Sequence, residues 1–317
     1  MKIACVTPDK KRDYTCENVL EGLHRLGHEL VISDPGNGFC DRAMNDGDFL
    51  REANTSDLLL VFFGKVRGNR PPRRYFVEDV NLPKQRKIYV DGSEWRMDGW
   101  DNVQQVAQSL EDASKRRGEP WLDREMMQSC SAYYKRECYP EDVLYGIKPL
   151  PFGLAARHIQ NVDDTQKDID VFCSFGHVKT GLRADVTKIC ERLAKERDDL
   201  KFSFENKLNQ EDYKERLRRS KIVIDAFGGG DTTDRFWEGV GASCCVLYQR
   251  HNVMFPHSFD EWKHAVSYTD KVSFETQLNV LLRDVDRTLN IGRSGFEHAL
   301  EFHTVKHRAL EIVKNVM

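Results

Sequence analysis

Residues 220–249 read SKIVIDAFGGGDTTDRFWEGVGASCCVLYQ, and this stretch decides the expected fold. It opens with the apolar run Ile222, Val223 and Ile224, which is typical of a strand buried on both faces of a parallel sheet. A glycine-rich turn, a short helix at 234–239 and a second apolar run at 244–248 follow. Strand, helix and strand in this order predict a parallel α/β sheet.

The turn inside this stretch favours an anionic ligand. Three glycines remove side chains, and three polar residues supply oxygens that can cap the helix: Gly228, Gly229, Gly230, Asp231, Thr232 and Thr233. Backbone N–H groups and the positive end of the helix dipole at such a turn suit a phosphate. Arg235 adds a full charge, and Glu238 lies on the same helical face, where it can accept hydrogen bonds from sugar hydroxyls. The alternative is close backbone packing beside a surface ion pair.

Length and composition narrow the class of protein. The 317 residues predict about two domains, and the net charge of −3 argues against a globally basic nucleic-acid binder. The nine cysteines form no C-x-x-C pair, which indicates a reduced cytoplasmic protein. No signal peptide and no membrane span are expected.

The remainder of the chain alternates between strands and helices. In a first domain at 1–155, strands are expected at 2–7, 29–33, 58–63 and 87–90, helices at 16–26, 102–110 and 125–137, and a strand and turn at 143–151. The second domain is expected at 156–295, and it begins with a polar linker at 155–166. Its expected elements are strands at 169–174 and 201–205 and helices at 182–195 and 210–219. A C-terminal helix within 296–317 is expected to pack back toward the first domain. Two Rossmann-like domains would place a ligand outside the carboxyl ends of their strands, in a cleft that they share.

Four segments of the second half carry a family resemblance: DVFCSFGHVKTGLR at 170–183, EDYKERLRRSKIVID at 211–225, GGGDTTDRFWEGVGASCCVL at 228–247 and FEHALEFHTVKHRALEIV at 296–313. In the first half, MKIACVTP, LHRLGHELVISDP and IKPLPFGL fit the same pattern. The chain resembles GT-B-fold glycosyltransferases, most closely the group 1 branch with spore-maturation-type (CgeB-like) proteins. The resemblance implies a hexosyltransferase with a nucleotide diphosphate sugar, UDP-glucose above all, as donor substrate, no cofactor and no bound metal.

The resemblance also implies which residues bind the sugar-nucleotide donor. Glu238 matches the glutamate that holds the donor ribose, but the earlier acid of the family's E-x7-E pattern falls at Gly230. Asp231 is a substitute for that acid to consider. Arg235 and the N–H groups of residues 229–233 would face the diphosphate, because cationic side chains and helix dipoles can neutralise the leaving group. The other residues implied at the donor are Arg183, Lys179, His177 and Lys207.

Two histidines near the C-terminus, His303 and His307, have the i, i+4 spacing of a zinc pair. No third ligand accompanies them, and the family has a similar H-x4-R pattern, here His303 to Arg308. Packing between the domains is therefore expected in place of metal binding.

The acceptor side carries a local basic segment. Residues 65–87 hold eight Lys or Arg and two acidic residues, so the local charge is 8 − 2 = +6. Within it, Arg67, Arg70, Arg73 and Arg74 are the candidates for nucleic-acid contacts, and DNA with a hydroxymethylated base is one acceptor to consider. A glycan, lipid or protein acceptor is the alternative, as is a solvated loop with no ligand.

A catalytic base is expected where strand 87–90 ends. Asp91 is the first candidate, Glu94 the second and Asp9 the third, since a carboxylate there could take the acceptor proton. Helix capping is the competing role for Asp91. The incomplete E-x7-E pattern leaves open a nucleotide- or nucleic-acid-binding module without turnover.

Overall fold

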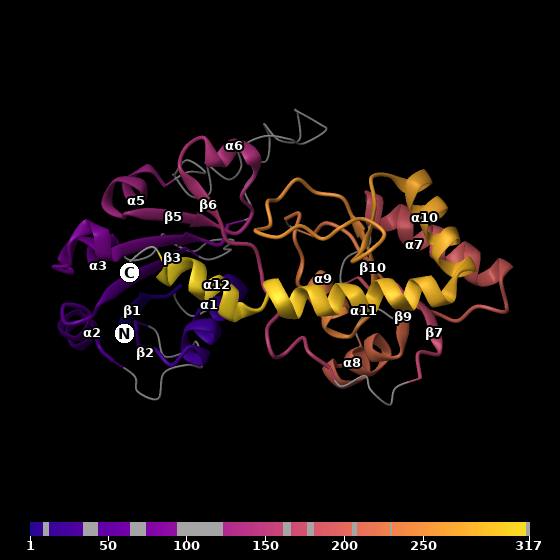
Figure 1. Cartoon of the computed structure of the whole chain (residues 1–317), viewed down its shortest axis with the longest axis horizontal. Coiled ribbons are helices and arrows are strands. Elements are labelled where there is room, and N and C mark those ends of the chain that lie inside the picture. The colour runs from indigo at the N-terminus through magenta and orange to yellow at the C-terminus, as the bar shows by residue number, and fades with distance from the viewer. Residues whose placement is uncertain are drawn as a thin grey trace. The chain divides into compact units, whose positions relative to one another are not determined.

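The computed structural model describes residues 1–8, 13–33, 44–63, 74–93, 123–160, 166–175, 181–204, 208–228 and 230–314. They form two α/β units, each with its own parallel sheet (Figure 1). Unit 1 consists of Met1–Phe152, Asn252–Pro256 and Val305–Met317, and unit 2 of Gly153–His251 and His257–Thr304.

The sheet of unit 1 has six parallel strands in the order β2-β1-β3-β4-β5-β6. The strands are β1 (Lys2–Val6), β2 (Glu29–Ile32), β3 (Leu58–Phe63), β4 (Lys87–Asp91), β5 (Ala132–Lys135) and β6 (Ile147–Pro149). The helices are α1 (Tyr14–Arg25), α2 (Asp46–Ala53), α3 (Arg74–Asp79), α5 (Arg124–Ser129), α6 (Pro140–Val143) and α12 (Val305–Val313), with a 3-10 turn, η2, at Lys84–Arg86.

Both faces of this sheet are buried, as an apolar strand without polar alternation requires. In β3, Leu58, Leu60 and Phe62 pack on the face that α1 and α12 cover. Leu59 and Val61 point to the opposite face and pack with residues of α2, α3 and α5. The last helix of the chain is therefore part of the core of unit 1.

The sheet of unit 2 has five parallel strands in the order β11-β10-β9-β7-β8. They are β7 (Ile169–Phe172), β8 (Phe202–Ser203), β9 (Ser220–Asp225), β10 (Cys245–Gln249) and β11 (Val266–Tyr268). The helices are α7 (Leu182–Glu196), α8 (Gln210–Arg218), α9 (Asp234–Gly241), α10 (Lys271–Arg283) and α11 (Val285–Phe302).

The β9 strand divides its side chains between two cores. Ile222 and Ile224 pack with residues of α7, α10 and α11, whereas Val223 packs with Leu217 of α8. On that second face, α9 approaches the sheet closely, because a Cβ at Gly239 would lie 2.9 Å from Val246 Cγ2. Such proximity holds the C-terminal half of α9 against β9 and β10.

The expected α/β class with parallel sheets is confirmed, but several element boundaries are wrong. The helix expected at 125–137 ends at Ser129 and gives way to β5, whose pairing with β4 and β6 involves residues distant in sequence. Strand 201–205 is reduced to Phe202–Ser203, and the segment at 143–151 forms a strand only at Ile147–Pro149. The C-terminal region is two helices that belong to different units, and the helix expected at 102–110 lies outside the described residues. No helix in the described ranges is long and apolar enough to cross a membrane.

Candidate functional site

The carboxyl end of β9 and the start of α9 are tied together by side chains. Thr233, the N-cap residue of α9, donates a 2.6 Å hydrogen bond from Oγ1 to Oδ1 of Asp225, the last residue of β9. Tyr268 Oη donates to the carbonyl oxygen of Asp225 at 2.9 Å. The Phe227 N–H donates to Gln249 Oε1 at 3.1 Å, and the Gly228 N–H to the Gly230 carbonyl at 2.9 Å. The glycine-rich loop is thus held at the strand ends, where α/β proteins bind ligands.

Two guanidinium groups from different helices meet at one aromatic ring. Arg183 of α7 lies 5.1 Å and Arg235 of α9 lies 4.8 Å from the centroid of the Phe175 ring. Arg183 Nη2 also donates a 2.9 Å hydrogen bond to the Ala226 carbonyl. Burial lowers the pKa of Arg183, and the charge of Arg235 lowers it further. The carboxylate of Asp225 interacts with both guanidinium groups, and Glu238 interacts with Arg235, so nearby negative charge offsets the repulsion between the two arginines.

Both of these arginines retain hydrogen-bonding capacity. The Nε atoms of Arg183 and Arg235 are buried and have no hydrogen-bond partner among the described residues. Buried N–H donors are normally satisfied, so unpaired ones indicate a place where a ligand can accept hydrogen bonds. Gly228 lies beside them, since a Cβ there would be 3.3 Å from Arg183 Nη2. The cluster therefore has the charge and the donors of an anion site.

Glu238 is held by a tyrosine from the neighbouring helix. Tyr213 of α8 donates a 2.7 Å hydrogen bond from Oη to Glu238 Oε2, and its ring packs edge-on against Phe172 at 5.2 Å. Burial and then the negative charge of Glu238 raise the pKa of Tyr213 above its ordinary value. The carboxylate is partly exposed and one turn along α9 from Arg235. An oriented acceptor of this kind can bind a hydroxyl group.

Asp225 is a buried carboxylate that the sequence analysis overlooked. Its side chain is 4% exposed, and burial raises its pKa to about 6 despite the Thr233 hydrogen bond and the charges of Arg235 and Arg183, which act in the opposite direction. A raised pKa next to cationic side chains at a strand end is a mark of functional sites. Its position after the apolar run 222–224 was the available signal, whereas Tyr213 had no local signal in the sequence.

Asp234, in the first turn of α9, is a further acidic residue near the candidate site. Asp234 Oδ1 lies 3.1 Å from His158 Nε2 and 3.3 Å from Arg157 Nη2. Burial alone would raise the pKa of Asp234, but the hydrogen bonds and charges of His158 and Arg157 lower it. Asp234 therefore stays ionised at the end of the helix where a negative charge is stabilising.

The structure brings some of the predicted donor residues together. Arg183, Arg235, Thr233 and Glu238 gather around the end of β9, and Gly230 is buried in the turn between them. Asp231 and Thr232 in the same turn are 5% and 6% exposed. The remaining predicted residues, Gly229, His177, Lys179 and Lys207, lie outside the described residues.

Asp91 ends β4 and is 2% exposed. Its Oδ1 accepts a 2.8 Å hydrogen bond from the Ser93 N–H, and its Oδ2 accepts a 2.7 Å hydrogen bond from Tyr133 Oη. Both carboxylate oxygens thus hold the end of the strand and the turn after it. The expected alternative, helix capping, is not what these two hydrogen bonds do, because Ser93 is in no described helix. The other base candidates, Glu94 and Asp9, lie outside the described residues.

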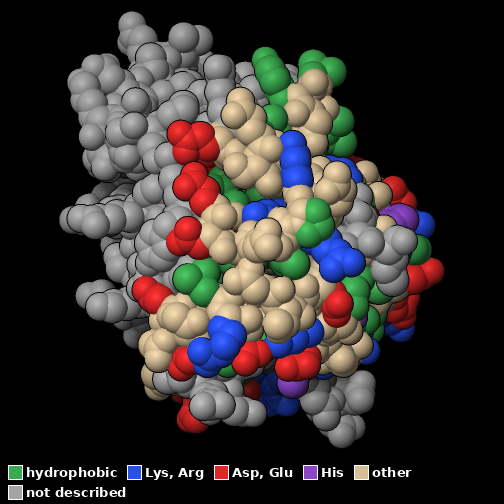
Figure 2. Space-filling view, turned by 90° about the vertical axis from the view of Figure 1, so that its left-hand side faces the viewer, with side chains coloured by type: hydrophobic (Ala, Val, Ile, Leu, Met, Phe, Trp, Pro, Cys, Tyr) green, Lys and Arg blue, Asp and Glu red, His purple; other side chains and the backbone are tan. Residues whose placement is uncertain are grey.

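Residues 65–73 of the basic segment, including Arg67, Arg70 and Arg73, lie outside the described residues. Arg74 begins α3, and its side chain is outside the described part as well. Figure 2 shows one face of the molecule, on which the described Lys and Arg side chains are interspersed with Asp and Glu. The described part of this face does not form a continuous basic surface of the kind that DNA binding uses.

His303 is fully buried in unit 2 and stacks on Phe259 at 4.8 Å. No group of three or more His, Cys, Asp or Glu side chains in the described ranges could hold a metal ion. Arg308, the other half of the H-x4-R pattern, is buried in unit 1 and donates from Nε to the Pro151 carbonyl at 3.0 Å. Burial lowers its pKa to about 9.

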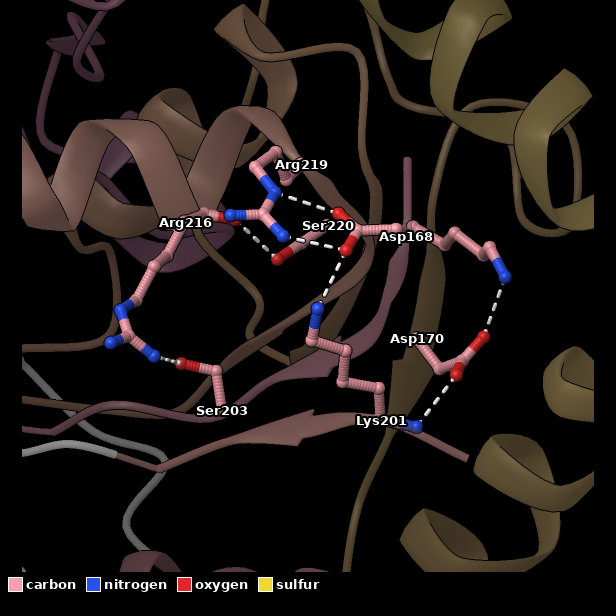
Figure 3. Close-up of polar contacts among 8 residues, drawn as sticks. Asp168, Asp170, Lys201, Ser203, Arg216, Arg219 and Ser220 are labelled. Atoms are coloured by element: carbon pink, nitrogen blue, oxygen red, sulfur yellow. Dashed lines mark hydrogen bonds and ion pairs between the residues drawn. The ribbon is translucent and has the colours of Figure 1, made fainter. Parts of the chain in front are cut away.

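A second charged cluster lies at the amino ends of the strands of unit 2, opposite the candidate site (Figure 3). Asp168, just before β7, accepts hydrogen bonds from Arg219 Nη2 and Lys201 Nζ, each at 2.6 Å. Asp170 accepts from Lys221 Nζ at 2.6 Å and from the Lys201 N–H at 2.8 Å. These acids and bases satisfy one another, so the cluster connects the amino ends of the strands and is not a second ligand site.

Comparison with known proteins agrees with this geometry. Residues 166–314, which contain Arg183, Asp225, Arg235 and Glu238, match a protein family described as glycosyl transferase-like. A search of curated protein sequences finds no significant relative.

Solved structures show which fold the chain has. A glycosyltransferase from Rickettsia africae superposes with a TM-score of 0.60 at 9% identity, over 99% of this chain and 97% of that one. Anabaena HepE in complex with UDP-glucose gives a TM-score of 0.55 at 9% identity, over 100% and 99%. A UDP-N-acetylglucosamine 2-epimerase homologue from Listeria monocytogenes gives 0.55 at 12% identity, over 98% and 94%. The chain therefore has the GT-B type of fold, and identities this low show the fold alone.

Proposed function

We propose that this chain is a glycosyltransferase that transfers a sugar from a UDP-sugar, with UDP-glucose the expected donor, to a hydroxyl group. The observation that carries the proposal is the pair of guanidinium groups, Arg183 and Arg235, on the Phe175 ring at the start of α9. The match of residues 166–314 to a glycosyl transferase-like family supports it, as does the UDP-glucose bound to HepE. Within that family, we assign the chain to the spore-maturation-type branch on its sequence pattern.

The arrangement suits the departure of a nucleoside diphosphate. Negative charge develops on the leaving group as the glycosidic bond breaks, and preorganised cations stabilise that charge. Arg183 and Arg235 would donate to the diphosphate through the Nε atoms that lack a partner among the described residues. The dipole of α9 and the N–H groups of the 230–233 turn would add to this, so we propose chemistry that does not depend on a divalent metal.

Glu238 would bind the donor ribose in this scheme. Its carboxylate is fixed by Tyr213, which leaves the other oxygen to accept hydrogen bonds from vicinal hydroxyls. Because Gly230 stands where related families have an acid, the second acid of the site would be Asp231 or Asp225. The proposed function does not depend on which of the two it is.

The proposed acceptor group is a hydroxyl, whichever molecule carries it. The local charge of +6 between residues 65 and 87 favours an anionic acceptor, and DNA with a hydroxymethylated base is the first one to test. The test replaces Arg73 and Arg74 with Ala and measures the salt dependence of duplex binding. A flatter dependence supports the DNA acceptor, and no binding of wild-type protein at low salt removes it. Asp91 and Glu94 are the base candidates that accompany this proposal.

The experiment that tests the donor uses UDP-glucose without an acceptor. Calorimetry measures binding, and release of UDP measures slow transfer to water, with and without EDTA. Binding with EDTA-resistant UDP release supports the transferase. Binding without UDP release, alone or with candidate acceptors, indicates a nucleotide-binding module that lacks turnover, and absence of binding contradicts the donor assignment.

A further inference from the structure

Asp225 occupies a fixed position at the candidate donor site. It ends β9, its side chain is 4% exposed, and its Oδ1 accepts the Thr233 hydrogen bond at 2.6 Å. Its own carbonyl accepts from Tyr268 Oη at 2.9 Å. Backbone and side chain are therefore both held, and the carboxylate has little freedom to turn away from its neighbours.

Charged groups from two helices face this carboxylate. Arg235 of α9 and Arg183 of α7 interact with it as opposite charges, and Glu238 of α9 interacts as a like charge. Tyr268 of β11 is the further titratable neighbour. With both carboxylates ionised, two negative charges balance the two guanidinium groups, so the net charge of the four is zero.

A nucleotide sugar would disturb this balance. Its diphosphate carries two negative charges, and hydrogen bonds to Arg183 and Arg235 would place them near the carboxylate of Asp225. Like charges in a buried site disfavour ionisation strongly, because little water is present to screen them. Since burial already raises the pKa of Asp225 to about 6, only a modest further rise is needed for protonation near neutral pH.

We propose that Asp225 is a positioning residue of the donor site that takes up a proton from solution, to a fractional extent near neutral pH, when a nucleotide sugar binds beside Arg183 and Arg235. The inference rests on the proposed function, since it requires a diphosphate at these two arginines. No bond of the donor changes in this step: the proton moves from solvent to a carboxylate oxygen of Asp225. The protonated carboxyl still accepts from Thr233, so the loop keeps its position.

The first measurement needs no variant. UDP-glucose is titrated into wild-type protein by calorimetry in buffers that share one pH and differ in ionisation enthalpy, which reports the protons taken up. UDP-glucose is the probe because each of its phosphates carries one ester and one anhydride bond and so has no proton that titrates near neutral pH, whereas the terminal phosphate of UDP itself titrates at about pH 6. We expect uptake of a fraction of one proton near neutral pH. We also expect affinity to fall about five- to tenfold from about pH 6 to about pH 8, as linkage requires.

The variant Asp225→Asn tests whether Asp225 is the group that takes up the proton. The amide can still accept from Thr233 but cannot take up a proton, so uptake and the pH dependence of affinity should both disappear. Asp170→Asn is the matched control, because Asp170 is a buried acid at the opposite edge of the same sheet, paired with Lys221 (Figure 3). Proton uptake should persist in this control.

The possible results separate the two proposals. Binding without proton uptake in wild-type protein overturns the role of Asp225 and leaves the donor assignment intact. Uptake that persists in Asp225→Asn also overturns it, because another group would then take up the proton. No binding of UDP-glucose at either pH overturns the proposed function, and this inference with it.

Discussion

Tyr213 Oη lies 2.7 Å from Glu238 Oε2, and this hydrogen bond joins α8 to α9. The two residues are 25 positions apart in sequence, so only the fold brings them together. The tyrosine ring is itself fixed by its edge-on contact with Phe172 of β7. The carboxylate that we assign to the ribose therefore has its direction set by the sheet, through one aromatic side chain.

Replacement of Glu238 by Ala should weaken UDP-glucose binding by about 1 to 3 kcal/mol, the typical cost of losing a charged hydrogen bond. Tyr213→Phe should weaken it less, by about 0.5 to 1.5 kcal/mol, because the carboxylate remains but is no longer oriented. In the double variant, the tyrosine change should add less than its own single-variant loss to that from Glu238→Ala, and any remaining loss would come from the interaction of Tyr213 with Arg235. Calorimetry measures all three affinities.

The control for the tyrosine change is Tyr145→Phe, which removes a hydroxyl from a side chain that is 57% exposed. It should leave UDP-glucose affinity unchanged. If Tyr213→Phe and Glu238→Ala were fully additive, the tyrosine would not act through the carboxylate, and its role as an orienting group would be rejected.

The paired arginines give a second prediction. Arg235→Gln should weaken UDP-glucose binding by about 1.5 to 3 kcal/mol and reduce its salt dependence, because a charged hydrogen bond to the diphosphate is lost. The control is Arg218→Gln on α8. The Arg218 side chain is 36% exposed, and its Nη2 lies 2.6 Å from Glu215 Oε2. This control should bind UDP-glucose like the wild type. Equal losses in the two variants would contradict a specific anion site at Phe175.

Local sequence was informative where strands are buried on both faces. The runs 58–63 and 222–224 are apolar without interruption, and they were placed correctly: residues 58–62 and 222–224 are all buried. The helix expected at 125–137 was wrong for the opposite reason. Its second half forms β5, in which Lys135 is fully buried, and only pairing with β4 and β6 decides that state.

For the candidate site too, the sequence predicted the residues that are close together in the chain and missed those that the fold brings in from elsewhere. Arg235, Thr233 and Glu238 stand in one turn and helix, so local spacing was sufficient to group them. Phe175, Tyr213 and Asp225 come from other elements, and their contacts with this group depend on strand order. Asp225 alone had a usable signal, since a charged residue directly after the apolar run 222–224 lies at the carboxyl end of the strand, where α/β proteins bind ligands.

Gly292 gives a prediction about stability. A Cβ at this position in α11 would lie 2.5 Å from the Ser243 carbonyl oxygen and 2.7 Å from the Cys244 carbonyl carbon, so Ala must displace backbone. Gly292→Ala should lower the free energy of unfolding by about 1 to 3 kcal/mol in urea denaturation.

Gly47→Ala in α2 is the matched control, because a Cβ at Gly47 would have its nearest contact at an ordinary 3.4 Å, to Asn45 Oδ1. It should be neutral or stabilising by up to about 1 kcal/mol. A neutral Gly292→Ala would show that α11 does not pack this closely on the start of β10.

The raised pKa of Asp225 gives a prediction about stability and pH. Its pKa is about 6 in the folded protein against an ordinary value of 3.8, so the folded state disfavours the ionised form. The destabilisation is absent at pH values below about 4, grows as the pH rises, and is complete above about pH 6. The difference between the two pKa values corresponds to roughly 3 kcal/mol, which is an upper limit for the effect.

Asp225→Asn removes the ionisation and keeps an acceptor for Thr233. Relative to wild type, its free energy of unfolding should therefore increase between about pH 4.5 and about pH 8, as urea denaturation at both values would measure. Asp170→Asn should be less stable than wild type at about pH 8, because it loses the 2.6 Å ion pair with Lys221. If Asp225→Asn were instead destabilised more at the higher pH, the ionised carboxylate would be a net stabilising partner of Arg183 and Arg235, and its proton uptake on donor binding would lose its physical basis.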